Sequence, residues 1–193
     1  MENTKIIYFL IGLFSSLSYL VGFISILRKK YQPKLFSRIV WLALSINNLI
    51  SVLLLSMGME TRILAWVTFL GSALIFIGSL TYLKYDFGLA EKIAAALLLI
   101  SGLIWITTDI PLLNLFIGLI AHFIGSIPTL VRVIKKPEEE NFSFWFFFFL
   151  GSVLALLVAD TSVIKSYIFV LYFASFDGIM ALCTSRKFFI KRV

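Results

Sequence analysis

The sequence predicts an all-α integral membrane protein in which seven transmembrane helices form two three-helix repeats joined by a linker helix. Three observations predict this fold: an excess of apolar residues, seven apolar runs, and a self-similarity at about half the chain length. Of the 193 residues, 61% are hydrophobic and 14% are charged, against about half and about a quarter in soluble domains. A chain of this size buries only about 70% of its unfolded surface, so lipid must solvate the excess.

Charged and turn residues divide the chain into runs that are long enough to cross a bilayer. A helix needs about 20 residues to cross about 30 Å of hydrocarbon. Continuous apolar runs indicate helices, because barrel strands alternate apolar and polar residues. Lys5 is the only basic residue before Arg28, so we interpret the first run as a retained helix and not a cleaved signal. The predicted spans are residues 6–27, 37–57, 63–83, 93–108, 111–134, 143–163 and 166–183.

The span ends carry turn and interface residues. Asp109 and Pro111 offer a cap and a first-turn proline between the fourth and fifth spans, and Asn141 or Ser143 can cap the sixth. We interpret Trp41 and Trp145 as anchors in the interface on the inner side.

Basic residues predict the orientation. Alternate loops carry fourteen Lys and Arg on one side and three on the other. The three are Lys5, Arg62 and Lys165. Because basic loops stay in the cytoplasm, we expect the N-terminus outside, the C-terminus inside and an odd number of spans.

The two halves of the chain resemble each other. A shift of 106 residues aligns Ile11-Gly12-Leu13 with Ile117-Gly118-Leu119 and Lys29-Lys30 with Lys135-Lys136. It also aligns Phe36-Ser37 with Phe142-Ser143, and one further residue aligns Gly71 with Gly178. We therefore predict a first repeat over residues 1–86, a linker helix over 87–109, and a second repeat with a basic tail over 110–193. An odd number of helices per repeat needs the linker to keep both repeats parallel.

The second repeat carries a family motif. The stretch IPTLVRVIKKPEEENFSFW has a Pro-polar pair, a basic stretch and a serine that opens the next helix; these are Pro128-Thr129, Lys135-Lys136 and Ser143. With the three-one-three arrangement, it resembles the SWEET sugar transporters and the wider PQ-loop superfamily, as a divergent member. SWEET proteins carry an Asn-Gly pair at the substrate site in their third and seventh helices, and Asp177-Gly178 stands at the second of these places. In the first repeat, Gly22 replaces the proline and Leu70 replaces the asparagine.

Asp177 and His122 are the ionisable groups predicted at mid-membrane depth. Asp177 should face the bundle interior, where it meets a cation or is protonated, because such a group is costly in lipid. It is a candidate for substrate binding or proton coupling, and a structural hydrogen bond is the alternative. His122, the only histidine, suits a proton relay with Asp177 or a helix–helix hydrogen bond.

Further polar and hinge candidates lie in the second and fifth spans. Asn47 and Asn48 project about 100° apart, so we expect one to face a cavity and the other a neighbouring helix. Ser126 can line a cavity or bond back to the backbone. Pro128 removes the hydrogen bond to the carbonyl of Ile124, which predicts a hinge or a static kink, and Gly22 is its counterpart in the first repeat.

These features predict a transporter for a small polar solute that works by alternating access, with proton coupling through Asp177 as an option. Aspartate in place of asparagine favours a cationic or amine-bearing solute, or proton coupling. The alternative is a membrane receptor on the same scaffold, as the KDEL receptors are. The chain has one His and one Cys, too few to assemble a catalytic acid–base set or a metal centre. We therefore expect neither an enzyme nor a metal or cofactor site. The expected partners are a small-molecule solute and the bilayer, without nucleic acid. The expected location is the plasma membrane of a prokaryote, and a monomer and a homo-oligomer both stay open.

Overall fold

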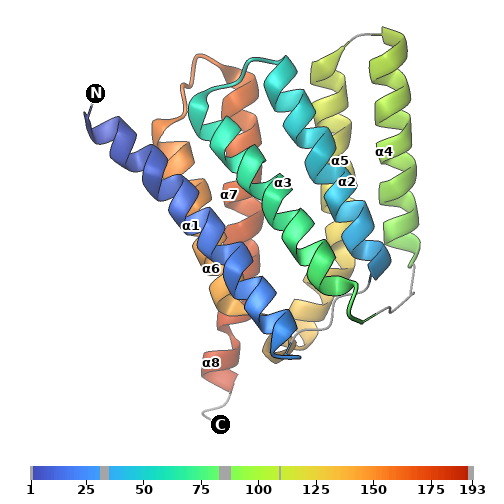
Figure 1. Cartoon of the computed structure of the whole chain (residues 1–193), viewed down its shortest axis with the longest axis vertical. Coiled ribbons are helices and arrows are strands. Elements are labelled where there is room, and N and C mark those ends of the chain that lie inside the picture. The colour runs from blue at the N-terminus through green and yellow to red at the C-terminus, as the bar shows by residue number, and fades with distance from the viewer. Residues whose placement is uncertain (1, 31–34, 83–87, 109, 191–193) are drawn as a thin grey trace.

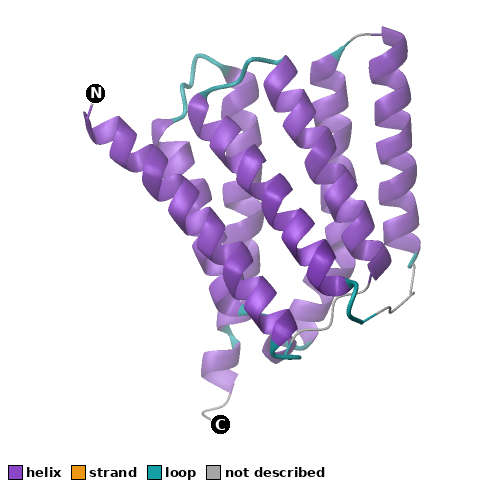
Figure 2. Cartoon of the chain, viewed as in Figure 1, coloured by secondary structure: helices purple, strands orange, loops and turns teal. Residues whose placement is uncertain are grey.

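The computed structural model describes residues 2–30, 35–82, 88–108 and 110–190, and these residues form helices and short connections without strands (Figure 2). Lys34, Lys84, Asp109, Lys191 and Arg192 lie outside the described residues, and with them the predicted cap at Asp109. The long helices are α1 (Glu2–Leu27), α2 (Leu35–Leu54), α3 (Met59–Ser79), α4 (Leu89–Thr108), α5 (Pro111–Lys135), α6 (Phe142–Val158) and α7 (Ile164–Ser185). Two short elements are the 3₁₀ turn η1 (Pro137–Glu139) and α8 (Lys187–Ile190).

Length and composition fit an integral, multi-pass membrane protein. Six helices of the described chain are long and apolar enough to cross a bilayer, and α6 is an apolar helix of 17 residues. Large apolar side chains cover the outside of the bundle: Leu89, Leu99, Ile106 and Leu157 are each more than 70% exposed. Such a surface is stable only against lipid.

The structure corrects the end of the sixth predicted span. Helix α6 ends at Val158, five residues before the predicted end. The carboxylate of Asp160 accepts hydrogen bonds from the hydroxyl and the backbone N–H of Ser162, at 2.6 and 2.9 Å. These hydrogen bonds lower the pKa of Asp160, and the resulting turn ends the helix because it offers the backbone a competing partner.

Two predicted helix ends are confirmed. Pro111 is the first residue of α5, where its missing N–H costs nothing. Asn141 caps α6, since its Oδ1 accepts a hydrogen bond of 3.0 Å from the N–H of Ser143.

The helices pack with α3 between α1 and α2, and α7 in contact with α5 and α6. Helix α6 also packs along α1, α2 packs along α5, and α4 stands at the edge of the bundle against α5 and α2 (Figure 1). Glycines permit two of the closest approaches. A Cβ on Gly71 of α3 would lie 2.1 Å from the ring of Tyr19 on α1, and one on Gly151 of α6 would lie 2.2 Å from Oγ of Ser15 on α1.

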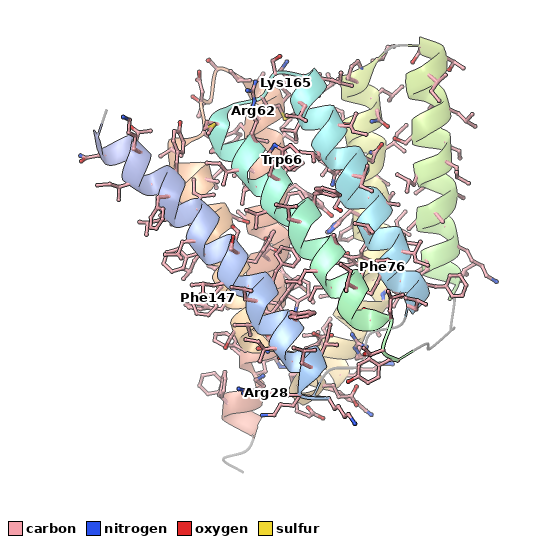
Figure 3. The ribbon with its side chains drawn as sticks, in the orientation of Figure 1. Arg28, Arg62, Trp66, Phe76, Phe147 and Lys165 are labelled. Carbon is pink, nitrogen blue, oxygen red and sulfur yellow. The ribbon has the colours of Figure 1, made fainter. Side chains whose placement is uncertain are left out.

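The bundle has a basic end and an opposite end. Helices α1, α3, α5 and α7 end at the basic end, where the C-terminus also lies (Figure 1). The N-terminus lies at the opposite end. Figure 3 shows Arg28 at the basic end, and Arg62 and Lys165 at the opposite end. The described basic residues on loops and helix ends of the basic end are Arg28, Lys29, Lys30, Arg38, Lys92, Arg132, Lys135, Lys136, Arg186 and Lys187.

Candidate functional site

An inner chamber lies between the helices near the middle of the bundle. Its volume is about 20 Å³, where a single water needs roughly 10–15 Å³ on the same measure. Six helices contribute to it: α1, α2, α3, α5, α6 and α7. Its lining residues are Tyr19, Trp41, Ser45, Asn48, Thr68, Ser72, His122, Phe144, Trp145, Phe148, Phe173, Phe176 and Asp177.

An outer chamber of about 40 Å³ adjoins the inner one and extends toward the basic end. Both chambers share the side chains of Tyr19, Trp41, Ser72, Phe144 and Trp145. The outer chamber adds Ser25 near the end of α1, Arg38 near the start of α2, and Asn141 at the start of α6. The two chambers therefore trace one polar route from mid-bundle to the basic end.

Asp177 lies on α7, eight residues before that helix ends at Ser185. Its side chain is 2% exposed and faces the inner chamber, as the sequence predicts. Oδ2 accepts a hydrogen bond of 3.0 Å from the hydroxyl of Ser152 on α6. Among the described residues, Asp177 has no basic side chain in ion-pair contact.

His122 lies in the middle of α5 and is 6% exposed. Its Nδ1 is 2.7 Å from the hydroxyl of Tyr172 on α7, and the donor of that hydrogen bond depends on the histidine tautomer. The imidazole is surrounded by aromatic rings. Its centroid lies 4.8 Å from that of Trp41, 5.6 Å from Tyr172, and 5.3 Å from each of Phe173 and Phe176.

His122 and Asp177, the two residues of the predicted proton relay, line the same chamber. They are not hydrogen-bonded to each other, and each has a different partner. His122 is bonded to Tyr172, and Asp177 to Ser152. The chamber that both residues line has room for about one water.

The two predicted asparagines divide only in part as expected: Asn48 lines the inner chamber, but Nδ2 of Asn47 makes no hydrogen bond to a neighbouring helix. Asn48 is 2% exposed and lines the inner chamber, whereas Asn47 is absent from its lining. A Cβ on Gly118 of α5 would lie 2.7 Å from Nδ2 of Asn47 and 3.0 Å from Oδ1 of Asn48. Neither of these buried atoms has a hydrogen-bond partner, so both stay available to a bound molecule or water.

The remaining candidates lie around the outer chamber. Ser126 is fully buried and donates a 2.6 Å hydrogen bond to the backbone carbonyl of His122. Of the two roles predicted for Ser126, this is the bond back to the backbone. It is not among the residues lining the two chambers, whereas Thr129 lines the outer one. Pro128 lies inside α5 with an exposed side chain. Gly22 lines the outer chamber, where an added Cβ would lie 2.9 Å from the ring of Phe144.

A hydrogen-bonded rim surrounds the mouth at the basic end. Arg132 forms an ion pair with Glu140, and the Nζ of Lys187 donates to the Glu140 carbonyl at 2.9 Å. Nδ2 of Asn141 donates to the hydroxyl of Ser25 at 2.8 Å, which joins the start of α6 to α1. Glu140 is 7% exposed because Arg132 and Lys187 hold it against the bundle.

An aromatic wall lines the chambers and was not predicted from the sequence. Trp145 is 5% exposed and lines both chambers, so its interpretation as an interface anchor is wrong. Trp41 is half-buried between the rings of His122 and the guanidinium of Arg38, which lies 5.7 Å from its ring centroid. Helical spacing could have indicated that Trp41 faces the chamber. Trp41, Ser45 and Asn48 stand at positions i, i+4 and i+7, which lie on one face of a helix.

No family model, curated protein or solved structure matches this chain. Among the described residues, no three His, Cys, Asp or Glu side chains gather as metal ligands. The site is therefore characterised by its own geometry: a buried carboxyl, a histidine and an asparagine within an aromatic wall.

Proposed function

We propose that this protein is a membrane carrier for a small polar solute that works by alternating access, on the SWEET or PQ-loop plan that its sequence resembles. The observation that carries the proposal is the inner chamber, where Asp177, His122 and Asn48 meet at mid-bundle. Ionisable groups at that depth are costly and mark substrate or proton pathways.

The helix contacts support two parallel repeats. A two-fold axis along the membrane normal would exchange α1 with α5, α2 with α6, and α3 with α7. Under that exchange, the packing of α1 on α6 becomes the packing of α5 on α2, and both pairs are present. Helix α3 between α1 and α2 likewise corresponds to α7 touching α5 and α6, with α4 as the linker.

The charge distribution supports a cytoplasmic location for the basic end and an external N-terminus, in the plasma membrane of a prokaryote. In that orientation the outer chamber leads from the cytoplasm to the substrate site. The opposite end is held together where the N–H of Gly58, before α3, donates to Oγ of Ser166 on α7 at 3.1 Å. Alternating access would break this contact while the basic end closes over the outer chamber.

Chamber size also supports a required motion. The inner chamber holds about one water, so a solute enters only when the repeats move apart. Gly22 against Phe144 and Pro128 within α5 are the proposed hinge positions, one in each repeat.

Uptake into proteoliposomes tests the proposal. Labelled sugars, amino acids, amines and vitamins are offered with and without an imposed proton gradient, to the parent and to Asp177→Asn. We expect accumulation of one solute class by the parent and its loss in the variant, and gradient-driven accumulation if Asp177 couples protons. Saturable binding without accumulation would instead establish the receptor alternative.

A further inference from the structure

We propose that the inner chamber binds the ammonium group of an amine-bearing solute, with Asp177 as its counter-ion and the surrounding rings as its walls. The inference rests on the proposed function only in taking the inner chamber as the solute site. It goes further by assigning the charge and the chemical class of the group that binds.

The first support is a buried carboxyl whose only partner among the described residues is neutral. Asp177 is 2% exposed, and the Ser152 hydroxyl bonds only to Oδ2. A buried carboxylate needs a cation or a proton, since desolvation without a partner is strongly unfavourable. An ammonium ion supplies the charge and also the donor.

The second support is an unpartnered acceptor on another helix, α2, that lines the chamber. Oδ1 of Asn48 is buried without a hydrogen-bond partner, on a side chain 2% exposed that lines the same chamber. An ammonium group has three N–H donors and no acceptor. Asp177 and Asn48 each accept one, and the hydroxyl oxygen of Ser45 or Ser72, which also line the chamber, accepts the third.

The third support is the aromatic wall. The rings of Trp41, Trp145, Phe148, Phe173 and Phe176 line the inner chamber. A desolvated cation is attracted to the faces of such rings. An anion in the inner chamber would face the carboxylate of Asp177.

In the closed conformation that the structure shows, size favours a primary amine with an apolar body. The inner chamber takes a group about as large as one water, which an –NH₃⁺ group matches and a trimethylammonium group exceeds. The body of the solute would extend into the outer chamber, whose walls include Tyr19, Ile75 and Phe144.

The test compares isosteres on the purified full-length protein in lipid nanodiscs. Probes are 2-phenylethylamine, its neutral analogue 2-phenylethanol, and the N,N,N-trimethylated amine. Binding is measured as the shift in melting temperature and by calorimetry, because a ligand that binds only the folded state raises that temperature. We expect the primary amine to bind, the alcohol to bind at least tenfold more weakly, and the trimethylated amine to bind more weakly than the primary amine.

Variants locate the effect. We expect Asp177→Asn to weaken binding of 2-phenylethylamine about 30-fold or more, as loss of a buried charge partner does. Asp160→Asn changes an exposed carboxyl in the loop after α6 and should leave binding unchanged. Phe176→Leu keeps an apolar wall but removes the ring. We expect it to weaken binding of the amine more than binding of the alcohol.

Two outcomes would overturn the inference. One is equal affinity of the parent for the amine and the alcohol, which does not depend on any variant folding. The other is unchanged amine affinity in Asp177→Asn. Failure of the carrier proposal has a separate signature. An amine that binds through Asp177 but never accumulates in vesicles refutes transport alone, whereas accumulation of a neutral solute refutes the amine assignment alone.

Discussion

His122 shows how one side chain is fixed by a neighbour on another helix. Its Nδ1 meets the Tyr172 hydroxyl at 2.7 Å, and four aromatic rings, including that of Tyr172, hold the plane of the imidazole. This hydrogen bond joins α5 to α7 and couples the tautomer of His122 to the direction of the Tyr172 hydroxyl, which can donate or accept. Nε2 is then the nitrogen left for chemistry in the chamber.

We predict that Tyr172→Phe changes the tautomer equilibrium of His122 and lowers the free energy of unfolding by about 0.6–2 kcal/mol, the range for hydrogen bonds between membrane helices. The ring that stacks 6.2 Å from Phe176 stays in place. His122 is the only histidine, so its ¹⁵N ring signals are unambiguous in NMR spectra. Tyr167→Phe, on the same helix and outside the chambers, is the control. Unchanged ¹⁵N signals in Tyr172→Phe would show that the hydrogen bond does not set the tautomer.

At this scale, the sequence predicted the polar half of the site and missed the apolar half. An acid or a histidine inside an apolar run is conspicuous, because its cost in lipid demands an interior position. A tryptophan near a span end is not, since Trp145 has the same local sequence context whether it faces lipid or the chamber. Only the packing of α6 against α7, with Trp145 5.9 Å from Phe176, determines its direction.

Helix α4 depends on a polar cluster for its attachment to the bundle. Nδ2 of Asn114 on α5 donates to Oγ of Ser51 on α2 at 2.7 Å. The hydroxyl of Ser101 on α4 donates to Oδ1 of Asn114 and, at 3.1 Å, to its carbonyl. All three side chains are fully buried. Because lipid offers no competing partner, this cluster specifies where three helices meet.

We predict that Asn114→Leu destabilises the protein by about 1–3 kcal/mol, because Ser51 and Ser101 lose a partner in a buried site. The measurement is unfolding in mixed micelles, followed by circular dichroism. Ile120→Leu is the control, since Ile120 lies on the same helix and is 53% exposed. If both variants unfold alike, the cluster does not hold the three helices together.

Helix boundaries were predictable where a local signal exists and less so elsewhere. Pro111 starts α5 and Asn141 caps α6 as predicted. The end of α6 was misplaced because Val158-Ala159 continues an apolar run, and only the Asp160–Ser162 turn ends the helix. Hydropathy indicates which residues can lie in lipid, whereas a capping turn determines where the helix ends.

In the whole molecule, the two chambers form a route from the interior to the basic end. The chambers lead from Asp177 to the basic end through Thr129 and Ser25, while the Gly58–Ser166 hydrogen bond joins loop and helix at the opposite end. Periodicity and charge predicted the helices and their direction. They did not predict the route, because it depends on which faces of six helices converge.

Access of a reagent from each side tests this asymmetry. In a Cys183→Ser background, which removes the only cysteine, single cysteines are introduced as Thr129→Cys in the outer chamber and Ser162→Cys in the loop after α6. Each is exposed to a membrane-impermeant maleimide from one side in oriented vesicles. We predict that Thr129→Cys reacts only from the side of the basic end, because the chamber opens there, and that Ser162→Cys reacts only from the other side.

Leu182→Cys, which is 71% exposed and faces outward from α7, provides the lipid-facing reference. A thiol in lipid stays protonated and nearly unreactive, because the thiolate is the nucleophile. Reaction of Thr129→Cys from the side that labels Ser162→Cys would contradict the predicted route. If a transported solute protects Thr129→Cys from the maleimide, the same cysteine also reports occupancy of the outer chamber. Such protection would link access at the basic end to binding near Asp177.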